Sequence, residues 1–358
     1  MNPQELMHSI IQRIATGPEL SKSISLEESE QAMTAILANE ISEVQSAIFL
    51  IAMRMKRETM DENIGILVAL LKLVDCKHST VENLVDIGDP YSGYNRSVPI
   101  SSFLPPLLAE LGFPSVIHGL DSVSPKYGLT HRHINQALEL KVDLSIAEAV
   151  SRVEDQAIGW SYVDQNQYCK PLHDLVPLRN QVIKRTVLNT LETLIGPIRG
   201  VNTHSILGYV HKAYPPIYAS LCEKAGFTSS LLIRGVEGGV VPSLRQKGLM
   251  ISYYGGIEKD RVDIDPKLLG IDSELRSISF PKKFENLKDK DLLAKHVVDL
   301  GCSALSGDKG MFYDGLVYSA SLILWHLRGS QTLPLAAEMV RSALDSGKAL
   351  VRLNAGSS

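Results

Sequence analysis

Apolar residues recur three and four positions apart from Pro3 to about Asp75, which is the period of an amphipathic helix. Within this stretch, three hydroxyl residues each precede an acid or amide by three positions, the spacing of a helix-capping box. These pairs are Ser25 with Glu28, Ser42 with Gln45, and Thr59 with Glu62. They predict helices near 26–38, 43–56 and 60–75, each with one apolar face that must pack on a neighbour. The N-terminal part is therefore predicted to be all-helical.

After Glu82 the pattern changes to short apolar runs that end at glycines or turns, as buried strands do. Helical patterns separate these runs, and such alternation favours an α/β layer with a largely parallel sheet. The predicted strands are 83–88, 115–119, 205–210, 229–235 and 248–254, and the predicted helices lie near 102–111, 213–225 and 311–327. The predicted fold class is a small all-helical N-terminal domain joined to a larger α/β domain with a largely parallel central sheet.

The same patterns suggest where the domains begin and end. We place the helical domain at residues 1–80 and the α/β domain at 81–164 and 201–358. Segment 165–200 has helical patterning again, and we expect it to fold back onto the helical domain. Residues 256–310 are polar and irregular, so they are predicted to form a solvated face. Its mixed charges are Lys282, Lys283, Glu285, Lys288, Asp289, Lys290 and Asp291.

The composition indicates a folded globular protein. With 358 residues the chain is long enough for two domains, and its 44% hydrophobic and 21% charged residues lie near the globular average. Lys and Arg number 36 against 40 Asp and Glu, a net charge of −4. Bulk charge therefore gives no argument for binding nucleic acid or an anionic membrane, although it leaves room for a local basic patch.

Cysteine use and hydropathy indicate the compartment. Four cysteines are spread along the chain without CxxC spacing, and we identify no leader-like segment, so we expect a reducing, cytoplasmic location. The longest apolar runs are far shorter than the roughly 20 residues that a membrane-spanning helix needs. We therefore expect no membrane partner.

Several segments resemble one enzyme family. The segments Leu26-Glu-Glu-Ser-Glu-Gln-Ala-Met33, Gln45-Ser-Ala-Ile-Phe-Leu50 and Met53-Arg-Met-Lys-Arg-Glu-Thr59 look like the N-terminal helices of the anthranilate phosphoribosyltransferase-like family (glycosyltransferase family 3), and Gly310-Met-Phe-Tyr-Asp314 and Ala343-Leu-Asp-Ser-Gly-Lys-Ala349 look like its closing helices. The resemblance implies that family's two-domain fold and a homodimer formed through the helical domain. It also implies transfer of phosphoribose from phosphoribosyl pyrophosphate to an aromatic amine with Mg²⁺.

The family holds the pyrophosphate with a glycine-rich GTGGDG loop followed by FN-x-ST. Here residues 89–94 read Asp-Pro-Tyr-Ser-Gly-Tyr, which replaces the glycines that allow backbone N–H groups to approach phosphate. Pro90 lacks an N–H donor and Asp89 would repel a polyanion. Ser101 and Ser102 fall on the family's serine and threonine positions. The alternative is that they cap the helix predicted after them.

Next, the family's KHGN motif appears here as Ile117-His-Gly-Leu120, so His118 and Gly119 are kept. Ser124 and Lys126 match the serine and lysine that follow. The resemblance therefore implies donor-binding candidates Ser101, Ser102, His118, Gly119, Ser124 and Lys126. The alternatives are a structural, hydrogen-bonded histidine and a solvated lysine.

The family's magnesium ligands are an adjacent Asp-Glu pair in a DGLDE turn. Val240 and Val241 stand at those positions, and valine cannot coordinate the ion. Glu237 is either a displaced ligand or a residue that stabilises its turn. We assign no metal ligand and no catalytic residue, and expect Mg²⁺ only if transferase activity is retained.

By contrast, the acceptor-side helix is kept, and the family's anthranilate-contacting arginine falls on Arg179. The planar guanidinium suits a carboxylate because it donates two parallel hydrogen bonds. The alternative is an ion pair between the domains. A protein that only recognises a small carboxylate through Arg179, as a regulator or scaffold, is a further interpretation.

Two functions follow from these observations. In the first, the chain has a phosphoribosyltransferase fold and uses phosphoribosyl pyrophosphate, but it does not catalyse the standard Mg-dependent anthranilate reaction. The second is a non-catalytic, homodimeric nucleic-acid-binding protein. This alternative follows from short segments such as Leu188-Asn-Thr-Leu-Glu-Thr-Leu194, which resemble a divergent branch of the family whose members are homodimers that bind nucleic acid and lack the transferase reaction. Its basic groove would include Lys184, Arg185, Arg199 and Arg234, and Tyr91 and Tyr94 would stack bases. The discriminating observation is whether the basic residues line one groove with His131, Arg132 and His133.

Overall fold

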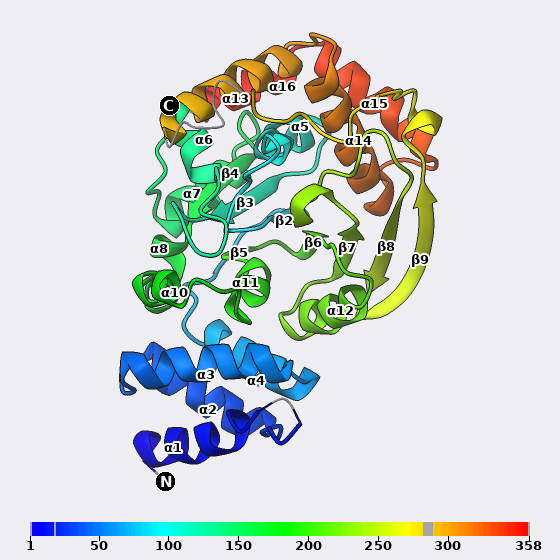
Figure 1. Cartoon of the computed structure of the whole chain (residues 1–358). Coiled ribbons are helices and arrows are strands. Elements are labelled where there is room, and N and C mark those ends of the chain that lie inside the picture. The colour runs from blue at the N-terminus through cyan, green and yellow to red at the C-terminus, as the bar shows by residue number, and fades with distance from the viewer. Residues whose placement is uncertain (1, 18, 282–288, 357–358) are drawn as a thin grey trace.

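The computed structural model describes residues 2–17, 19–281 and 289–356. It contains a helical N-terminal domain below a larger α/β domain (Figure 1). The helical domain consists of α1 (Pro3–Ile14), α2 (Leu26–Leu37), α3 (Glu43–Lys56) and α4 (Met60–Leu71).

Helix capping sets the boundaries of this domain. At Ser25 and Thr59 the reciprocal capping box forms: the Ser25 hydroxyl accepts from the Glu28 N–H at 3.1 Å, and the Glu28 carboxylate accepts from the Ser25 N–H at 3.0 Å. At Ser42 only half of the box forms, because the Gln45 side chain accepts from the Ser42 hydroxyl instead of its N–H. The three predicted helices are confirmed, although α4 ends at Leu71 and not near 75.

The α/β domain is built on a seven-stranded sheet with the strand order β4-β3-β2-β6-β7-β8-β9. The pairings from β4 to β7 are parallel, and β8 and β9 join antiparallel at one edge. The predicted fold class is therefore confirmed. The strands are β2 (Asn83–Gly88), β3 (Ser115–Gly119), β4 (Trp160–Asp164), β6 (Asn202–Gly208), β7 (Ser229–Ile233), β8 (Gly248–Tyr254) and β9 (Ile257–Ile264); a separate parallel pair joins β1 (Lys77–His78) and β5 (Ile198–Arg199).

Alternating side chains give the sheet two apolar faces. Val85 and Ile87 share one core with α5 and α14, whereas Leu84 shares the other with the helical domain and with segment 165–200. The helices that follow the helical domain are α5 (Leu104–Glu110), α6 (His131–Ala137), α7 (Ile146–Glu154), α8 (Gln165–Tyr168), α9 (Lys170–His173), α10 (Val176–Val182), α11 (Leu188–Leu191), α12 (Tyr214–Lys224), α13 (Lys290–Leu305), α14 (Met311–His326), α15 (Leu333–Asp345) and α16 (Lys348–Ala355).

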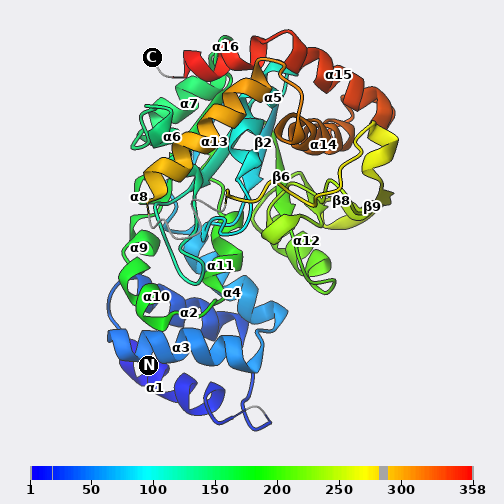
Figure 2. The same ribbon diagram turned by 45° about the horizontal axis from the view of Figure 1, so that its top comes forward.

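Segment 165–200 runs through four short helices and lies against the helical domain. Helix α10 contacts α3, and both views place α10 on the side of the α/β domain that faces the helical domain (Figures 1 and 2). The Asp75 N–H also donates to the Tyr168 carbonyl at 2.7 Å. The exact domain boundaries stay a prediction.

Two parts of the expected organisation are wrong. The stretch 256–310 is not irregular, because it contains β9 and α13. Strand β4 was also not predicted. The charged residues Lys282, Lys283, Glu285 and Lys288 lie outside the described residues, whereas Asp289 caps α13 by accepting from the N–H groups of Asp291 and Leu292. Within the described ranges, no helix is both long and apolar enough to cross a membrane.

Two buried histidines join three strands to α14. Nδ1 of His204 lies 2.7 Å from the Ser229 hydroxyl, which lies 2.8 Å from Nε2 of His326. Nδ1 of His326 lies 2.8 Å from the Ser252 hydroxyl. Burial lowers the pKa of His204 to about 4 and that of His326 to about 3. Both rings are therefore neutral in the folded protein at neutral pH.

This network makes stability depend on pH. Because the folded pKa values lie below the unfolded value of 6.5, the unfolded chain takes up more protons as the pH falls below 6.5. We expect the free energy of unfolding to fall between about pH 6.5 and 4, by up to about 1.4 kcal/mol per pH unit for each histidine. Urea unfolding at several pH values measures this loss. His326→Gln should flatten the dependence, and the exposed His8→Gln should not; equal slopes for both variants would contradict the assignment.

Candidate functional site

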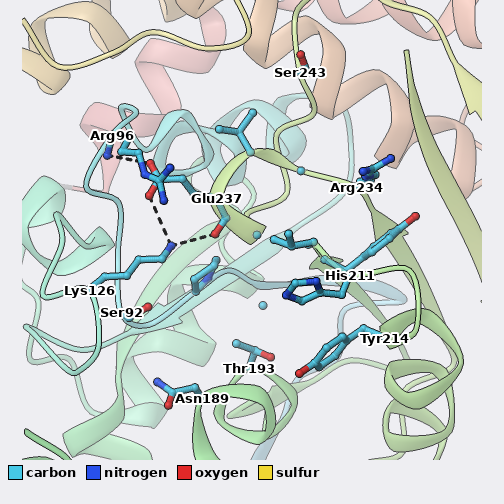
Figure 3. A pocket seen from close by; sticks show the side chains of 18 of the residues that line it. Ser92, Arg96, Lys126, Asn189, Thr193, His211, Tyr214, Arg234, Glu237 and Ser243 are labelled. Atoms are coloured by element: carbon cyan, nitrogen blue, oxygen red, sulfur yellow. Dashed lines mark hydrogen bonds and ion pairs between the residues drawn. The ribbon is translucent and has the colours of Figure 1, made fainter. Parts of the chain in front are cut away.

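A pocket of about 730 Å³ opens at the carboxyl ends of three adjacent parallel strands. Strand β2 ends at Gly88, β6 ends at Gly208, and Arg234 directly follows β7; all three residues line the pocket. Ligands commonly bind at this edge of an open α/β sheet. The helical domain contributes Arg54 from α3 to the lining. The pocket is thus placed by the sheet and bordered by both domains. Figure 3 shows side chains that line it.

Close packing of glycines shapes one wall. A Cβ atom on Gly208 would lie 2.1 Å from the Gly239 carbonyl oxygen, and one on Gly239 would lie 1.8 Å from the Tyr94 hydroxyl. The end of β6, the turn after β7 and the loop after β2 therefore touch one another directly. A side chain at either glycine would force these segments apart.

The pocket is strongly basic although the chain is acidic overall. Five arginines line it, and among the described residues none of them takes part in a salt bridge. Glu237 is the acidic residue in the described lining. The cations of the lining are Arg54, Arg96, Lys126, Arg185, Arg234, Lys247 and Arg276. Unpaired guanidinium groups gathered around one concavity attract an anionic ligand.

Aromatic rings line the side of the pocket at the start of α12. The centroids of His211 and Tyr214 lie 6.0 Å apart, and those of Tyr214 and Tyr218 lie 5.9 Å apart. Figure 3 shows His211 and Tyr214 side by side at the pocket wall. None of these three rings was among the residues predicted from the sequence. The sequence signal was the i, i+4 spacing of Tyr214 and Tyr218, which places these two rings on one face of α12, whereas His211 lies in the turn before the helix.

The donor-loop position is organised around Asp89, which is fully buried. Its carboxylate accepts hydrogen bonds from the Tyr94 hydroxyl at 2.6 Å, the Ser101 hydroxyl at 2.7 Å and the Val240 N–H at 3.0 Å. Nε2 of His131 lies 3.0 Å away. Burial acts to raise the pKa of Asp89, but the hydrogen bonds from His131, Ser101 and Tyr94 outweigh it and hold the pKa below its usual value. Asp89 is therefore ionised, and its hydrogen bonds hold these residues together inside the protein.

Ser101 and Ser102 belong to this buried network. The Ser102 hydroxyl lies 2.8 Å from Nδ1 of His131. Helix α5 begins at Leu104 after Phe103, and no side chain caps it. The alternative that the two serines cap a helix is therefore wrong.

His118 and Tyr91 are also internal. Nε2 of His118 lies 3.0 Å from Asp86, and its Nδ1 bonds to the Tyr91 hydroxyl, which also meets the hydroxyl of Tyr168. Tyr91 and Tyr94 are only 2% and 4% exposed. The expectation that these two tyrosines stack bases is wrong for this conformation, because their ring faces are covered.

The remaining donor candidates divide between the core and the pocket. Gly119 ends the buried strand β3, and the Ser124 hydroxyl donates to the Arg179 carbonyl at 2.8 Å. The Lys126 ammonium donates to the carbonyls of Gly93 and Glu237 at 3.0 and 2.9 Å, and it lines the pocket. Burial lowers the pKa of Lys126. Lys126 is therefore not the solvated lysine of the alternative interpretation.

Arg179 is engaged by an acid. Its two terminal nitrogens donate to the Glu192 carboxylate at 2.7 and 2.9 Å, and both side chains are buried. An ion pair does form, but both partners lie within segment 165–200, so the expectation of a pair between domains is wrong. Arg179 does not line the pocket, so in this conformation its paired nitrogens are not available to the carboxylate of an acceptor substrate.

The structure places two of the four residues of the predicted basic groove at the pocket. Arg185 and Arg234 line the pocket, whereas Lys184 is exposed outside the lining. Arg199 is buried, donates to the Ala225 carbonyl and lies 4.0 Å from the Phe227 ring centroid. His131, Arg132 and His133 do not join the groove: His131 contacts Asp89, Arg132 pairs with Asp143 and Asp164, and His133 pairs with Asp121.

The turn after β7 does not fit a magnesium ion. Val240 and Val241 offer no side-chain oxygen, and the Glu237 carboxylate already accepts from the Ser97 hydroxyl and from backbone N–H groups. In the part of the chain that the structure describes, no three His, Cys, Asp or Glu side chains gather as metal ligands would. Burial acts to raise the pKa of Glu237, but the Ser97 hydrogen bond and the Lys126 charge hold it low. The Glu237 carboxylate therefore links the turn after β7 to residues 95–97 of another loop.

Comparison with known proteins agrees with this fold. Residues 8–73 match the helical bundle domain of a glycosyl transferase family, and residues 92–350 match its α/β domain. The chain belongs to this glycosyl transferase family. An uncharacterised protein of Aquifex aeolicus is 27% identical over 85% of this chain and 88% of its own length. The anthranilate phosphoribosyltransferase of Thermomicrobium roseum is 24% identical over 97% and 95%.

A solved structure extends the comparison. The anthranilate phosphoribosyltransferase of Saccharomyces cerevisiae, in complex with PRPP and Mg, superposes with a TM-score of 0.80 at 16% identity and covers 97% of this chain and 96% of that one. At this identity the likeness shows the fold alone. Together with the family matches, it confirms the resemblance to anthranilate phosphoribosyltransferases that the sequence motifs indicated.

The buried pair of Arg179 and Glu192 leads to a stability prediction. Glu192→Gln leaves a buried guanidinium without a counter-charge, and we expect it to lower the free energy of unfolding by about 3–5 kcal/mol. Denaturant unfolding measures this loss. The double variant Arg179→Met with Glu192→Leu removes both charges and should lose much less. A double variant as unstable as Glu192→Gln would show that the packing at this site, and not the ion pair, carries the stability.

Proposed function

We propose that the pocket binds single-stranded nucleic acid on a phosphoribosyltransferase fold. The observation that carries this proposal is the set of five arginines that line one pocket and, within the described residues, form no salt bridge. Guanidinium groups donate paired hydrogen bonds to phosphate oxygens, and a basic groove follows a nucleic-acid backbone. His211, Tyr214 and Tyr218 supply rings on which bases stack. Through Arg54, the helical domain would also contact the bound nucleic-acid strand.

We further propose that the chain does not carry out Mg-dependent transfer of phosphoribose to anthranilate. Pro90 has no N–H to offer a phosphate, and the N–H groups of Gly93 and Tyr94 already donate to the carbonyls of Pro90 and Leu129. Arg179 is held by Glu192, and valines stand at the metal positions. The loss of several charge-stabilising groups together costs far more than the roughly 2.7–4 kcal/mol typical of one missing oxyanion donor. Phosphoribosyl pyrophosphate, seen in the yeast relative, is retained as a competing ligand to test.

An apolar stripe on α3 supports a homodimer through the helical domain. Val44 and Met55 are 70% and 71% exposed, and Ile48 and the half-buried Ile51 lie between them at spacings of four, three and four residues. This spacing places the four side chains in one row along the helix, as in a helix-pairing seam. A second copy of the same row would cover it. The four cysteines are free in the described structure, which suits the reducing cytoplasm that we propose as its location.

The nucleic-acid proposal is tested by substituting the pocket arginines one at a time. Fluorescence anisotropy with a labelled dT12 oligonucleotide should show weaker binding for Arg185→Ala and for Arg234→Ala. Each should also reduce the slope of log affinity against log salt by about 0.7, the single-strand value for one phosphate contact. Lys184→Ala is the matched control, since Lys184 is the exposed neighbour of Arg185 outside the lining.

Thermal shift in parallel wells separates the two functions. A rise in melting temperature with the oligonucleotide at low salt supports the proposal, because a ligand stabilises the state that it binds. A rise only with phosphoribosyl pyrophosphate plus Mg²⁺ would instead restore the transferase.

The dimer proposal has its own test. Ile48→Glu places a charge in the α3 stripe, and we expect it to convert a dimer to a monomer in sedimentation velocity at micromolar concentration. Val351→Glu is the control, because Val351 is also an exposed apolar residue but lies on α16 in the other domain. A wild-type protein that sediments as a monomer at every concentration tested would refute the dimer.

A further inference from the structure

At the rim of the pocket, the chain holds a carboxylate of its own in a site built for an anion. The N–H groups of Arg96 and Ser97 each donate to Glu237 Oε1 at 2.9 Å, and the Asn95 N–H reaches Oε2 at 3.3 Å. The Ser97 hydroxyl donates to Oε1 at 2.8 Å. We call this group of donors from residues 95–97 the rim nest. Lys126 stands beside it, with its ammonium 3.7 Å from Glu237 Oε2.

The rim nest has the donor set that binds phosphate. Successive backbone N–H groups that converge on one point form an anion-binding concavity, and a hydroxyl and an ammonium complete the arrangement seen around phosphate oxygens. The side chains of Glu237 and Lys126 are 8% and 17% exposed, so the site is partly dehydrated and its hydrogen bonds are strengthened. Arg96 itself lines the pocket, which brings a free guanidinium to the same rim (Figure 3).

Glu237 also has a strained backbone conformation. Its φ is +54°, a left-handed value that is costly for a residue with a Cβ, and Gly238 beside it has φ +86°. The turn from Gly235 to Gly239 is therefore rich in residues that tolerate other conformations. Rotation of one side chain is enough to vacate the rim nest, since the donors belong to a different loop.

We propose that the rim nest is a phosphate subsite of the pocket, and that the Glu237 carboxylate occupies it until a ligand phosphate displaces it. The proposal rests on the proposed function in one respect, that the pocket receives a phosphate-bearing ligand. Glu237 then acts as an internal competitor. A terminal phosphate suits the subsite best, because it presents three unesterified oxygens and up to two charges, whereas a phosphodiester within a strand presents two oxygens and one charge. The ligand group is thus a phosphate monoester or pyrophosphate end.

If Glu237 has only a structural role, its removal should change the affinity for a terminal phosphate in the opposite direction. If the carboxylate only fastens residues 95–97, its removal loosens the loop that carries Arg96 and weakens binding. If the carboxylate competes for the site, its removal strengthens the binding of a terminal phosphate. The two interpretations are therefore separated by the direction of one change in affinity.

The experiment compares dT12 with a 5′-phosphate and dT12 with a 5′-hydroxyl, together with inorganic pyrophosphate, on wild-type protein and on two variants. Glu237→Gln keeps the side-chain shape without the charge. Glu237→Gly removes the side chain and suits the positive φ, so it preserves the turn. We expect both to bind the 5′-phosphorylated strand and pyrophosphate about tenfold more tightly, the effect of about one charge-assisted hydrogen bond. The 5′-hydroxyl strand should change by much less.

Asp265→Asn is the matched control for charge. Asp265 pairs with the pocket residue Lys247 at 3.1 Å, so this variant also removes one negative charge beside the pocket, yet it leaves the rim nest intact. It should change the affinity for both strands equally. Adding Ser97→Ala to Glu237→Gln removes a donor of the rim nest and should cancel part of the gain.

The outcomes distinguish the two proposals. Equal or weaker binding of the 5′-phosphorylated strand and pyrophosphate by both Glu237 variants, with an unchanged melting temperature, overturns the subsite. A gain no larger than that of Asp265→Asn overturns it as well. If wild type binds neither oligonucleotide, the nucleic-acid proposal fails, and the pyrophosphate titration alone then decides the subsite.

Discussion

The pocket depends on one buried carboxylate. Asp89 draws together the loop after β2, Ser101 before α5, His131 on α6 and the Val240 backbone after β7. A buried charge is tolerated only when hydrogen bonds replace its hydration, so these segments are constrained to meet around it. The tyrosine-bearing loop closes inward as a result. The basic side chains that line the pocket lie outside this buried network.

The order of the elements was predictable from the sequence because it follows from local rules. The capping residues and apolar periodicity placed the N-terminal helices, and glycine-terminated apolar runs placed five of the seven strands of the sheet. Strand β9 was missed because it is an antiparallel edge strand whose residues, from Ile257 to Ile264, are mostly exposed and charged. Neither face of such a strand gives the apolar signal of a buried one. Helix α13 was missed for a similar reason, since its polar face dominates the beginning of the helix.

The site was harder to predict because its residues come together only in three dimensions. Arg54, Arg96, Arg185, Arg234 and Arg276 are far apart in the chain, so local charge pointed to Arg185 and Arg234 but not to the other three arginines of the pocket. Arg179 and Arg199 show the opposite error. The sequence suggested that both were free to bind a ligand, but both are buried, where Arg179 pairs with a carboxylate and Arg199 packs on an aromatic ring. The partner of a charged residue, which decides whether it is free, is not encoded near that residue in the chain.

Helix α3 is constrained on three of its faces. Phe49, Leu50 and Met53 fill the core of the helical domain, Arg54 reaches the pocket, and Val44 and Met55 lie on the exposed stripe. A helix of 14 residues has few positions that are free of all three demands. Random substitution should therefore be tolerated less in α3 than in α1 or α2. A change that adapts one of its faces is also constrained by the other two, so the proposed binding surface and the proposed association surface would not evolve independently along this helix.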